Sequence, residues 1–141
     1  NMDMSQIDFS FNTPISTEEA LKLHPMTLAF IGDAVQALYA RTRISLSSSS
    51  KTGILHKQVT KVVKATAQAH VIDLIHEEFD EVEADVFRRA RNCQIQTSAK
   101  HAERGEYRKA SGFEAVLGYL FVTANSERLF HFLEKSFEES L

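Results

Sequence analysis

The stretch that most constrains the fold is "GFEAVLGYLF", residues 112–121, because it is apolar on nearly every side of a helix. Such a helix is typical of a buried core element. Glu114 is its only ionisable group apart from the hydroxyl of Tyr119, and a carboxylate in these surroundings must be desolvated or compensated. Gly118, one turn after Glu114 on the same side, leaves room for a neighbour.

A second apolar stretch, "LAFIGDAV" at residues 28–35, also carries one acid, Asp33, directly after Gly32. Glycine costs roughly 1 kcal/mol against alanine inside a helix. At about 100° per residue, large apolar side chains gather on one side of this helix (Leu28, Ile31, Val35, Leu38, Tyr39). Asp33 falls roughly opposite, on a stripe of small side chains (Ala29, Ala37, Ala40). We expect another helix to approach closely there.

The rest of the chain predicts an all-α fold, because 141 residues contain only two prolines and five glycines and show no convincing strand. Capping-box patterns predict helix starts at Ser16 of "STEE" and at Asp80 with Glu83. The expected helices run from Ser16 to near "LHP", from Pro25 to about Ile44, from Gly53 to Ala69, through "VIDLIHEE", from Asp80 to "RRARN", from Phe113 to Thr123 and from Glu127 to Glu139. We expect loops at "SLSSSS" and over most of residues 94–112.

The length fits one domain with a real core, which we place at residues 13–141 after a loose N-terminal segment at residues 1–12. Cys93 is the only cysteine, so these residues form no intrachain disulfide. No leader opens the chain, and no apolar run reaches the roughly 18 residues of a membrane span. We therefore expect a cytoplasmic protein, with an organelle form whose targeting peptide was removed still open.

Charge is unevenly distributed along the chain. The net charge is −3, yet residues 88–109 hold seven basic residues against two acids, a local net charge of +5. A basic patch on an acidic protein is the footprint expected of a phosphate-backbone binder. The alternative is a solvated basic loop without a partner. The basic residues are Arg88, Arg89, Arg91, Lys100, Arg104, Arg108 and Lys109.

Asp33 and Glu114 have nothing nearby in the sequence to neutralise them. A divalent cation would compensate both, since Mg²⁺ is typically held by one or two carboxylates and keeps several waters. The alternative is that each acid caps a neighbouring helix or pairs with a buried Arg or Lys. The six histidines and Cys93 show no spacing typical of zinc.

These stretches together resemble the ribonuclease III family. "LAFIGDAV" resembles the signature helix of the endonuclease domain, with Asp33 at a metal-binding aspartate, and "ASGFEAVLGYLF" resembles the second motif, with Glu114 at its metal-binding glutamate. "LHKQVTKVVKATAQA", "RRARN" and "YRKASGFEA" are similar to the mini-ribonuclease III subfamily in order and spacing. The resemblance covers about residues 22–135.

The chain departs from the full-length enzymes at two positions. They place four carboxylates around the metals, whereas the matching positions for the other two are here Ala29 and Ser111. The mini subfamily works with the reduced set. The chain also ends 27 residues after Glu114, so we expect no double-stranded-RNA-binding domain and assign RNA capture to the basic residues of 88–109.

The resemblance implies an endoribonuclease that cuts double-stranded RNA to 5′-phosphate and 3′-hydroxyl ends. It implies a homodimer, Mg²⁺ with Mn²⁺ as a substitute, catalysis by Asp33 and Glu114, a stem in the precursor of 23S ribosomal RNA as substrate, and a ribosomal protein as a further partner. A rival hypothesis is a catalytically inactive scaffold of this fold that binds structured RNA or the ribosome. A third is a helical protein-interaction module, in which both acids should be paired internally.

Overall fold

The computed structural model describes residues 13–47, 51–93 and 103–140, and for residues 103 and 104 it describes the backbone alone. Its helices are α1 (Thr17–Leu21), α2 (Pro25–Ser47), α3 (Thr52–Val63), α4 (Ala65–Ile75), the short 3₁₀ helix η2 (His76–Glu78), α5 (Glu81–Arg91), α6 (Glu103–Val122) and α7 (Ser126–Ser140). The described residues contain no strand. The all-α prediction is therefore confirmed.

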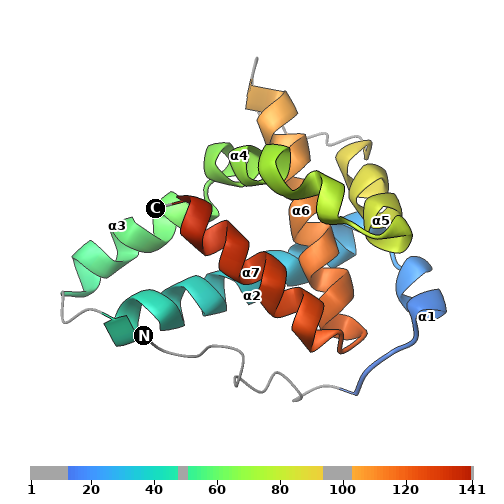
Figure 1. Cartoon of the computed structure of the whole chain (residues 1–141), viewed down its shortest axis with the longest axis horizontal. Coiled ribbons are helices and arrows are strands. Elements are labelled where there is room, and N and C mark those ends of the chain that lie inside the picture. The colour runs from blue at the N-terminus through green and yellow to red at the C-terminus, as the bar shows by residue number, and fades with distance from the viewer. Residues whose placement is uncertain (1–12, 48–50, 94–102, 141) are drawn as a thin grey trace.

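Helix α6 is the central element, as its apolar sequence predicts. It runs through the middle of the molecule in Figure 1, with α2 behind it and α7 in front, while α4 and α5 flank it. Its core side chains are fully or almost fully buried (Phe113, Ala115, Val116, Leu117, Leu120). At roughly 1.5–3 kcal/mol for each large apolar side chain removed from water, this helix is a main source of stability.

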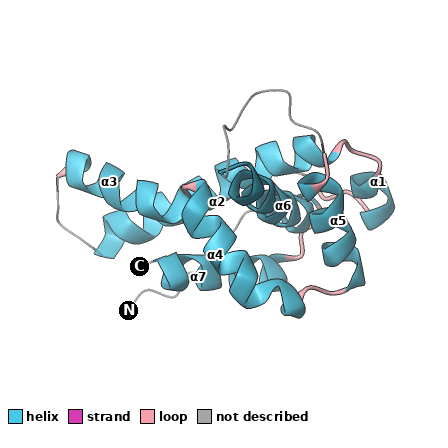
Figure 2. Cartoon of the chain, turned by 90° about the horizontal axis from the view of Figure 1, so that it is seen from above, coloured by secondary structure: helices cyan, strands magenta, loops and turns pink. Residues whose placement is uncertain are grey.

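Helices α2 and α3 form an arm that extends away from α5, which is plain when the molecule is seen from above (Figure 2). Three of the large side chains expected on the apolar side of α2, Leu28, Val35 and Tyr39, are buried. Leu38, expected beside them, is instead 49% exposed, because no described element covers that edge of α2.

The two predicted capping boxes are confirmed. Ser16 accepts from the Glu19 amide at 3.1 Å and starts α1, and Asp80 accepts from the Glu83 amide at 2.8 Å and starts α5. In each box the glutamate returns a bond to the cap's own amide. These reciprocal bonds satisfy donors that a helix start otherwise leaves unpaired.

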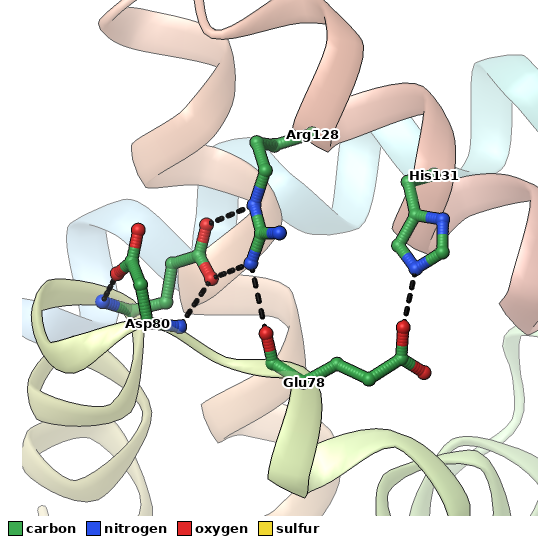
Figure 3. A network of polar contacts seen from close by, with 5 residues as sticks. Glu78, Asp80, Arg128 and His131 are labelled. Carbon is green, nitrogen blue, oxygen red and sulfur yellow. Dashed lines mark hydrogen bonds and ion pairs between the residues drawn. The ribbon is translucent and has the colours of Figure 1, made fainter.

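The start of α5 is also tied to α7 (Figure 3). Arg128 of α7 donates through Nε to the buried carboxylate of Glu83 at 2.9 Å, forms a second bond to it through Nη2, and donates to the Glu78 carbonyl at 2.9 Å. His131, one turn along α7, lies 2.6 Å from the Glu78 carboxylate. This network fixes the 3₁₀ turn between α4 and α5 against the last helix.

Two expected boundaries were wrong. The helix expected over Gly53–Ala69 is broken at Lys64, whose extended backbone (φ −68°, ψ 151°) ends α3 and starts α4 in a new direction. The loop expected over residues 94–112 is helical from Glu103 onward, because α6 continues its core helix toward the N-terminus. The part of that loop at 94–102 and the segment 1–12 lie outside the described residues.

Candidate active site

The candidate site lies where α2 crosses α6, and two glycines make the crossing possible. A Cβ on Gly32 would overlap the carbonyl oxygen of Glu114 and lie 2.8 Å from the amide nitrogen of Gly118. A Cβ on Gly118 would likewise overlap the carbonyl oxygen of Leu28. The two backbones are therefore in direct contact. This contact explains why glycine is kept in the middle of both helices despite its cost.

Asp33 and Glu114 meet at this crossing, since their side chains are in hydrogen-bond contact. Burial, the hydrogen bond to Asp33 and the negative charge of Asp33 together raise the pKa of Glu114 to about 8, although a hydrogen bond from Gln68 of α4 acts in the opposite direction. One proton is thus held between the two carboxylates near neutral pH. Two acids that share one proton are favourably placed to exchange it for a cation.

No Lys or Arg within the described ranges forms an ion pair with either acid. The internal ion pairs that the hypothesis of a protein-interaction module predicts for Asp33 and Glu114 are therefore not found among these residues. No group of three or more His, Cys, Asp and Glu side chains suited to a metal occurs in that part of the chain either. Ala29 and Ser111, at the positions of the other two carboxylates, are both buried.

The site opens on one side to a groove of about 360 Å³ along the exposed edge of α2. Asp33 is exposed and lines this groove together with apolar side chains: Phe30, Ile31, Ala34, Val35, Leu38 and Phe121. Glu114 is only partly buried. A substrate or a hydrated ion could therefore reach the two carboxylates from solvent.

The structure separates the predicted basic residues into groups. Arg88, Arg91 and Lys109 line one cavity of about 390 Å³ between α4, α5 and α6, together with Asp73 and His76. Lys109 pairs with Asp73 at 2.8 Å, Arg88 pairs with Asp85, and Arg91 stacks over Phe87 at 5.6 Å. These residues are partly engaged within the fold.

The remaining basic residues do not line that cavity in what the structure describes. Arg89 and Arg108 are half-buried on α5 and α6. Arg104 falls in the first turn of α6, where the backbone alone is described, and Lys100 lies outside the described residues. Their assignment to RNA stays a prediction.

Sequence reasoning missed two buried amides, Gln68, which contacts Glu114, and Gln36, which contacts Gln68. Gln36 of α2 and Gln68 of α4 are each 1% exposed, and Gln68 hydrogen-bonds the Glu114 carboxylate. Their only signal in the sequence is a lone amide among small and apolar neighbours, as in "AVQAL" and "ATAQAH".

Comparison with known proteins shows which family the chain belongs to. The model of the ribonuclease III domain matches residues 26–125, a range that contains both glycines, both carboxylates and Gln68. A Mini-ribonuclease 3 of Thermoanaerobacter sp. (strain X514) is 45% identical, over 96% of this chain and 96% of the relative. This chain is a member of the mini-ribonuclease III group of the ribonuclease III family.

Other mini-ribonuclease III relatives agree with this assignment. The Streptococcus pneumoniae protein is 44% identical over 76% of this chain and 85% of its own length, and the Staphylococcus aureus protein is 41% identical over 80% and 86%. A crystal structure of a Fusobacterium nucleatum protein superimposes with a TM-score of 0.75 at 24% identity, covering 85% of this chain and 96% of the other. That likeness shows a shared fold.

Family membership makes the protein an endoribonuclease of the ribonuclease III type. The prediction of that family from the sequence is confirmed. Among the helices that the structure describes, none is long and apolar enough to cross a membrane.

Proposed function

We propose that the protein is a divalent-metal-dependent endonuclease that cuts double-stranded RNA, with Asp33 and Glu114 as catalytic metal ligands. The observation that carries the proposal is the contact between these two carboxylates at the α2–α6 crossing, without a described Lys or Arg paired to either. Two carboxylates with solvent on one side suit Mg²⁺, which keeps several of its waters, and Mn²⁺ accepts the same ligands.

Asp33 and Glu114 would hold the cation, which would supply polarisation of the scissile phosphate and a lowered pKa of the attacking water. The protein's own part is to hold the two carboxyl groups close together, where a cation would replace the proton between them. Gly32 and Gly118 allow the helices to approach, and exposure of Asp33 leaves the ligand sphere open to a phosphate oxygen. The ends expected from the family resemblance are 5′-phosphate and 3′-hydroxyl.

The basic residues of α5 and α6, together with Lys100 between them in the sequence, are the proposed contacts to the RNA backbone. A-form RNA hides its major-groove base edges, so recognition rests on phosphates, 2′-hydroxyls and overall shape. Binding should therefore weaken steeply as salt rises. The contacts we propose are Arg88, Arg89, Arg91, Lys100, Arg104, Arg108 and Lys109.

The working unit we propose is a homodimer, because Phe30 is 80% exposed and Leu38 49% exposed along the groove beside Asp33. An apolar strip of this kind favours burial against another chain. A second copy would set two sites across one duplex. From the resemblance we take a precursor 23S ribosomal RNA stem as substrate and a ribosomal protein as a further partner. The single cysteine favours a reducing compartment such as the cytoplasm.

The test is cleavage of an end-labelled RNA duplex with Mg²⁺, with Mn²⁺ and with EDTA, using the wild type, Asp33→Asn and Glu114→Gln. We expect cutting only with metal, and a loss of at least about 100-fold in each variant, because each removes a charged ligand. Glu127→Gln changes an exposed carboxylate in the first turn of α7, outside the crossing, and should keep near-normal cleavage.

Two outcomes would contradict the proposal in different ways. A wild type that binds the duplex but never cuts it would support the inactive scaffold. A protein that neither binds nor cuts at low salt would remove double-stranded RNA as its substrate.

A further inference from the structure

Three buried polar side chains form a chain of hydrogen bonds that reaches the candidate site. Ser136 of α7, Gln36 of α2 and Gln68 of α4 are 0%, 1% and 1% exposed. Gln36 donates through Nε2 to the Ser136 hydroxyl at 2.7 Å, and Gln68 donates through Nε2 to the Gln36 carbonyl oxygen. The last link is the hydrogen bond between Gln68 and the carboxylate of Glu114.

The direction of these bonds makes Gln68 a donor to Glu114. A primary amide nitrogen carries two N–H groups, and Glu114 in the ionised form that would bind a metal only accepts. One N–H of Gln68 is directed at Gln36, so the other is available to the carboxylate. Since Gln36 presents its oxygen to Gln68 and its nitrogen to Ser136, turning either amide over would place like groups against each other.

We propose that Gln68 is a positioning residue that aims the Glu114 carboxylate at the metal, and that Gln36 and Ser136 hold Gln68 in the orientation needed. The proposal rests on the proposed function, because it concerns the same metal site. It adds residues from α4 and α7 to a site whose ligands come from α2 and α6.

The burial of these residues supports a functional reason for keeping them. Buried amides and hydroxyls contribute less to the stability of the fold than well-packed apolar side chains do, unless all their hydrogen bonds are formed. Here the series of hydrogen bonds joins side chains from four helices and ends on Glu114, a proposed metal ligand. Partners that orient a metal ligand in this way typically change metal affinity about 10–100-fold when removed.

The test measures Mn²⁺ binding by electron paramagnetic resonance without RNA, in the wild type, Gln68→Met and Gln36→Met. Methionine keeps the length of glutamine and removes the donor. We expect Mn²⁺ to bind about tenfold more weakly to Gln68→Met and less severely so to Gln36→Met. Gln58→Met, the same change on α3 outside this chain of bonds, should bind Mn²⁺ as the wild type does.

Cleavage supplies an independent readout. In Gln68→Met the Mg²⁺ concentration for half-maximal cleavage should rise about tenfold, while the rate at saturating Mg²⁺ stays within about threefold of the wild type. A general loss of structure would instead lower the saturated rate. Circular dichroism confirms that each variant is folded, and if Gln68→Met does not fold, Gln36→Met decides alone.

Mn²⁺ affinity within twofold of the wild type in folded Gln68→Met would overturn the inference. So would an equal loss in Gln58→Met. Failure of the proposed function would give a different result. In that case the wild type itself would bind no more Mn²⁺ than Asp33→Asn does.

Discussion

At the scale of single residues, the site depends on two positions where no side chain is present. Gly32 and Gly118 let the α2 and α6 backbones touch, which brings Asp33 and Glu114 within hydrogen-bond contact. The carboxylates perform the proposed chemistry, but the glycines set the distance between them. A mutation that leaves both acids intact can therefore still destroy the site.

Gly32→Ala tests this dependence directly. Its Cβ would overlap the Glu114 carbonyl, which is backbone and cannot turn aside, so we expect a loss of about 3 kcal/mol in the free energy of unfolding. Gly53→Ala is the matched control, because nothing lies within 4 Å of its Cβ and alanine is the better helix former. Urea unfolding of both variants measures the difference. Equal stability of the two variants would contradict the close crossing.

The shared proton gives a pH dependence with a definite sign. The folded protein keeps the Glu114 proton up to about pH 8, whereas an ordinary carboxyl loses it near 4.5. Folding therefore binds a proton between these values, and the metal-free protein should lose stability as pH rises from about 5 to 8. Thermal unfolding in EDTA should show this decline in the wild type and a flatter profile in Glu114→Gln.

Because both proteins contain the same six histidines, the difference between the two profiles isolates Glu114. Mg²⁺ must displace the shared proton, so it should stabilise the wild type more at about pH 8 than at about pH 6. Parallel profiles for the wild type and Glu114→Gln would show that the carboxyl is not perturbed by folding.

At the scale of helices, the Arg128–Glu83 pair holds α7 against the start of α5. The Glu83 side chain is only 1% exposed, so loss of Arg128 would leave a buried charge with one remaining donor, the Asp80 amide at 2.8 Å. Arg128→Met should lower the free energy of unfolding by about 3 kcal/mol, the low end for a broken buried pair, because Arg128 itself is 41% exposed.

The exposed Arg88–Asp85 pair provides the matched control. Its side chains are 56% and 38% exposed, so Arg88→Met should cost at most about 1 kcal/mol. Adding Glu83→Gln to Arg128→Met should recover part of the lost stability by removing the stranded charge. If urea unfolding gives the same value for Arg128→Met and Arg88→Met, the pair has no special role.

The elements also show what the sequence could predict. Both capping boxes and the apolar helix around Glu114 were identified correctly, because each carries a local signal: a reciprocal side-chain bond or a continuous apolar surface. The break at Lys64 has no such signal, since no glycine or proline stands there. The early start of α6 was also missed, because "ERGEYRKASG" is polar and contains two glycines.

At the scale of the whole molecule, the two acids could be identified from the sequence but their meeting could not. Asp33 and Glu114 are 81 positions apart in the sequence and are brought together by the crossing of two helices, which periodicity within either helix does not determine. The same holds for the polar chain from Ser136 to Gln68, whose members come from three helices. Lone polar residues acquire a role only once tertiary packing gives them partners.

The proposed homodimer is also a property of the whole molecule. Phe30 is 80% exposed and shares its groove with Asp33, so a second copy seated there would cover apolar surface and lie beside the cleavage site. Light scattering after gel filtration should give a dimer for the wild type and a monomer for Phe30→Glu, because a charge in an apolar interface is costly. Leu74→Glu, on a different helix and 53% exposed, should remain a dimer.

Loss of the dimer should also change the RNA products. Two sites across one duplex cut both strands in one encounter, whereas a monomer carries a single site. Phe30→Glu should therefore release nicked duplexes before double-strand breaks, which native gels of a duplex labelled on both strands distinguish from the paired cuts of the wild type. A wild type that is monomeric at micromolar concentration would contradict the dimer. A dimeric Phe30→Glu would instead place the interface on another surface.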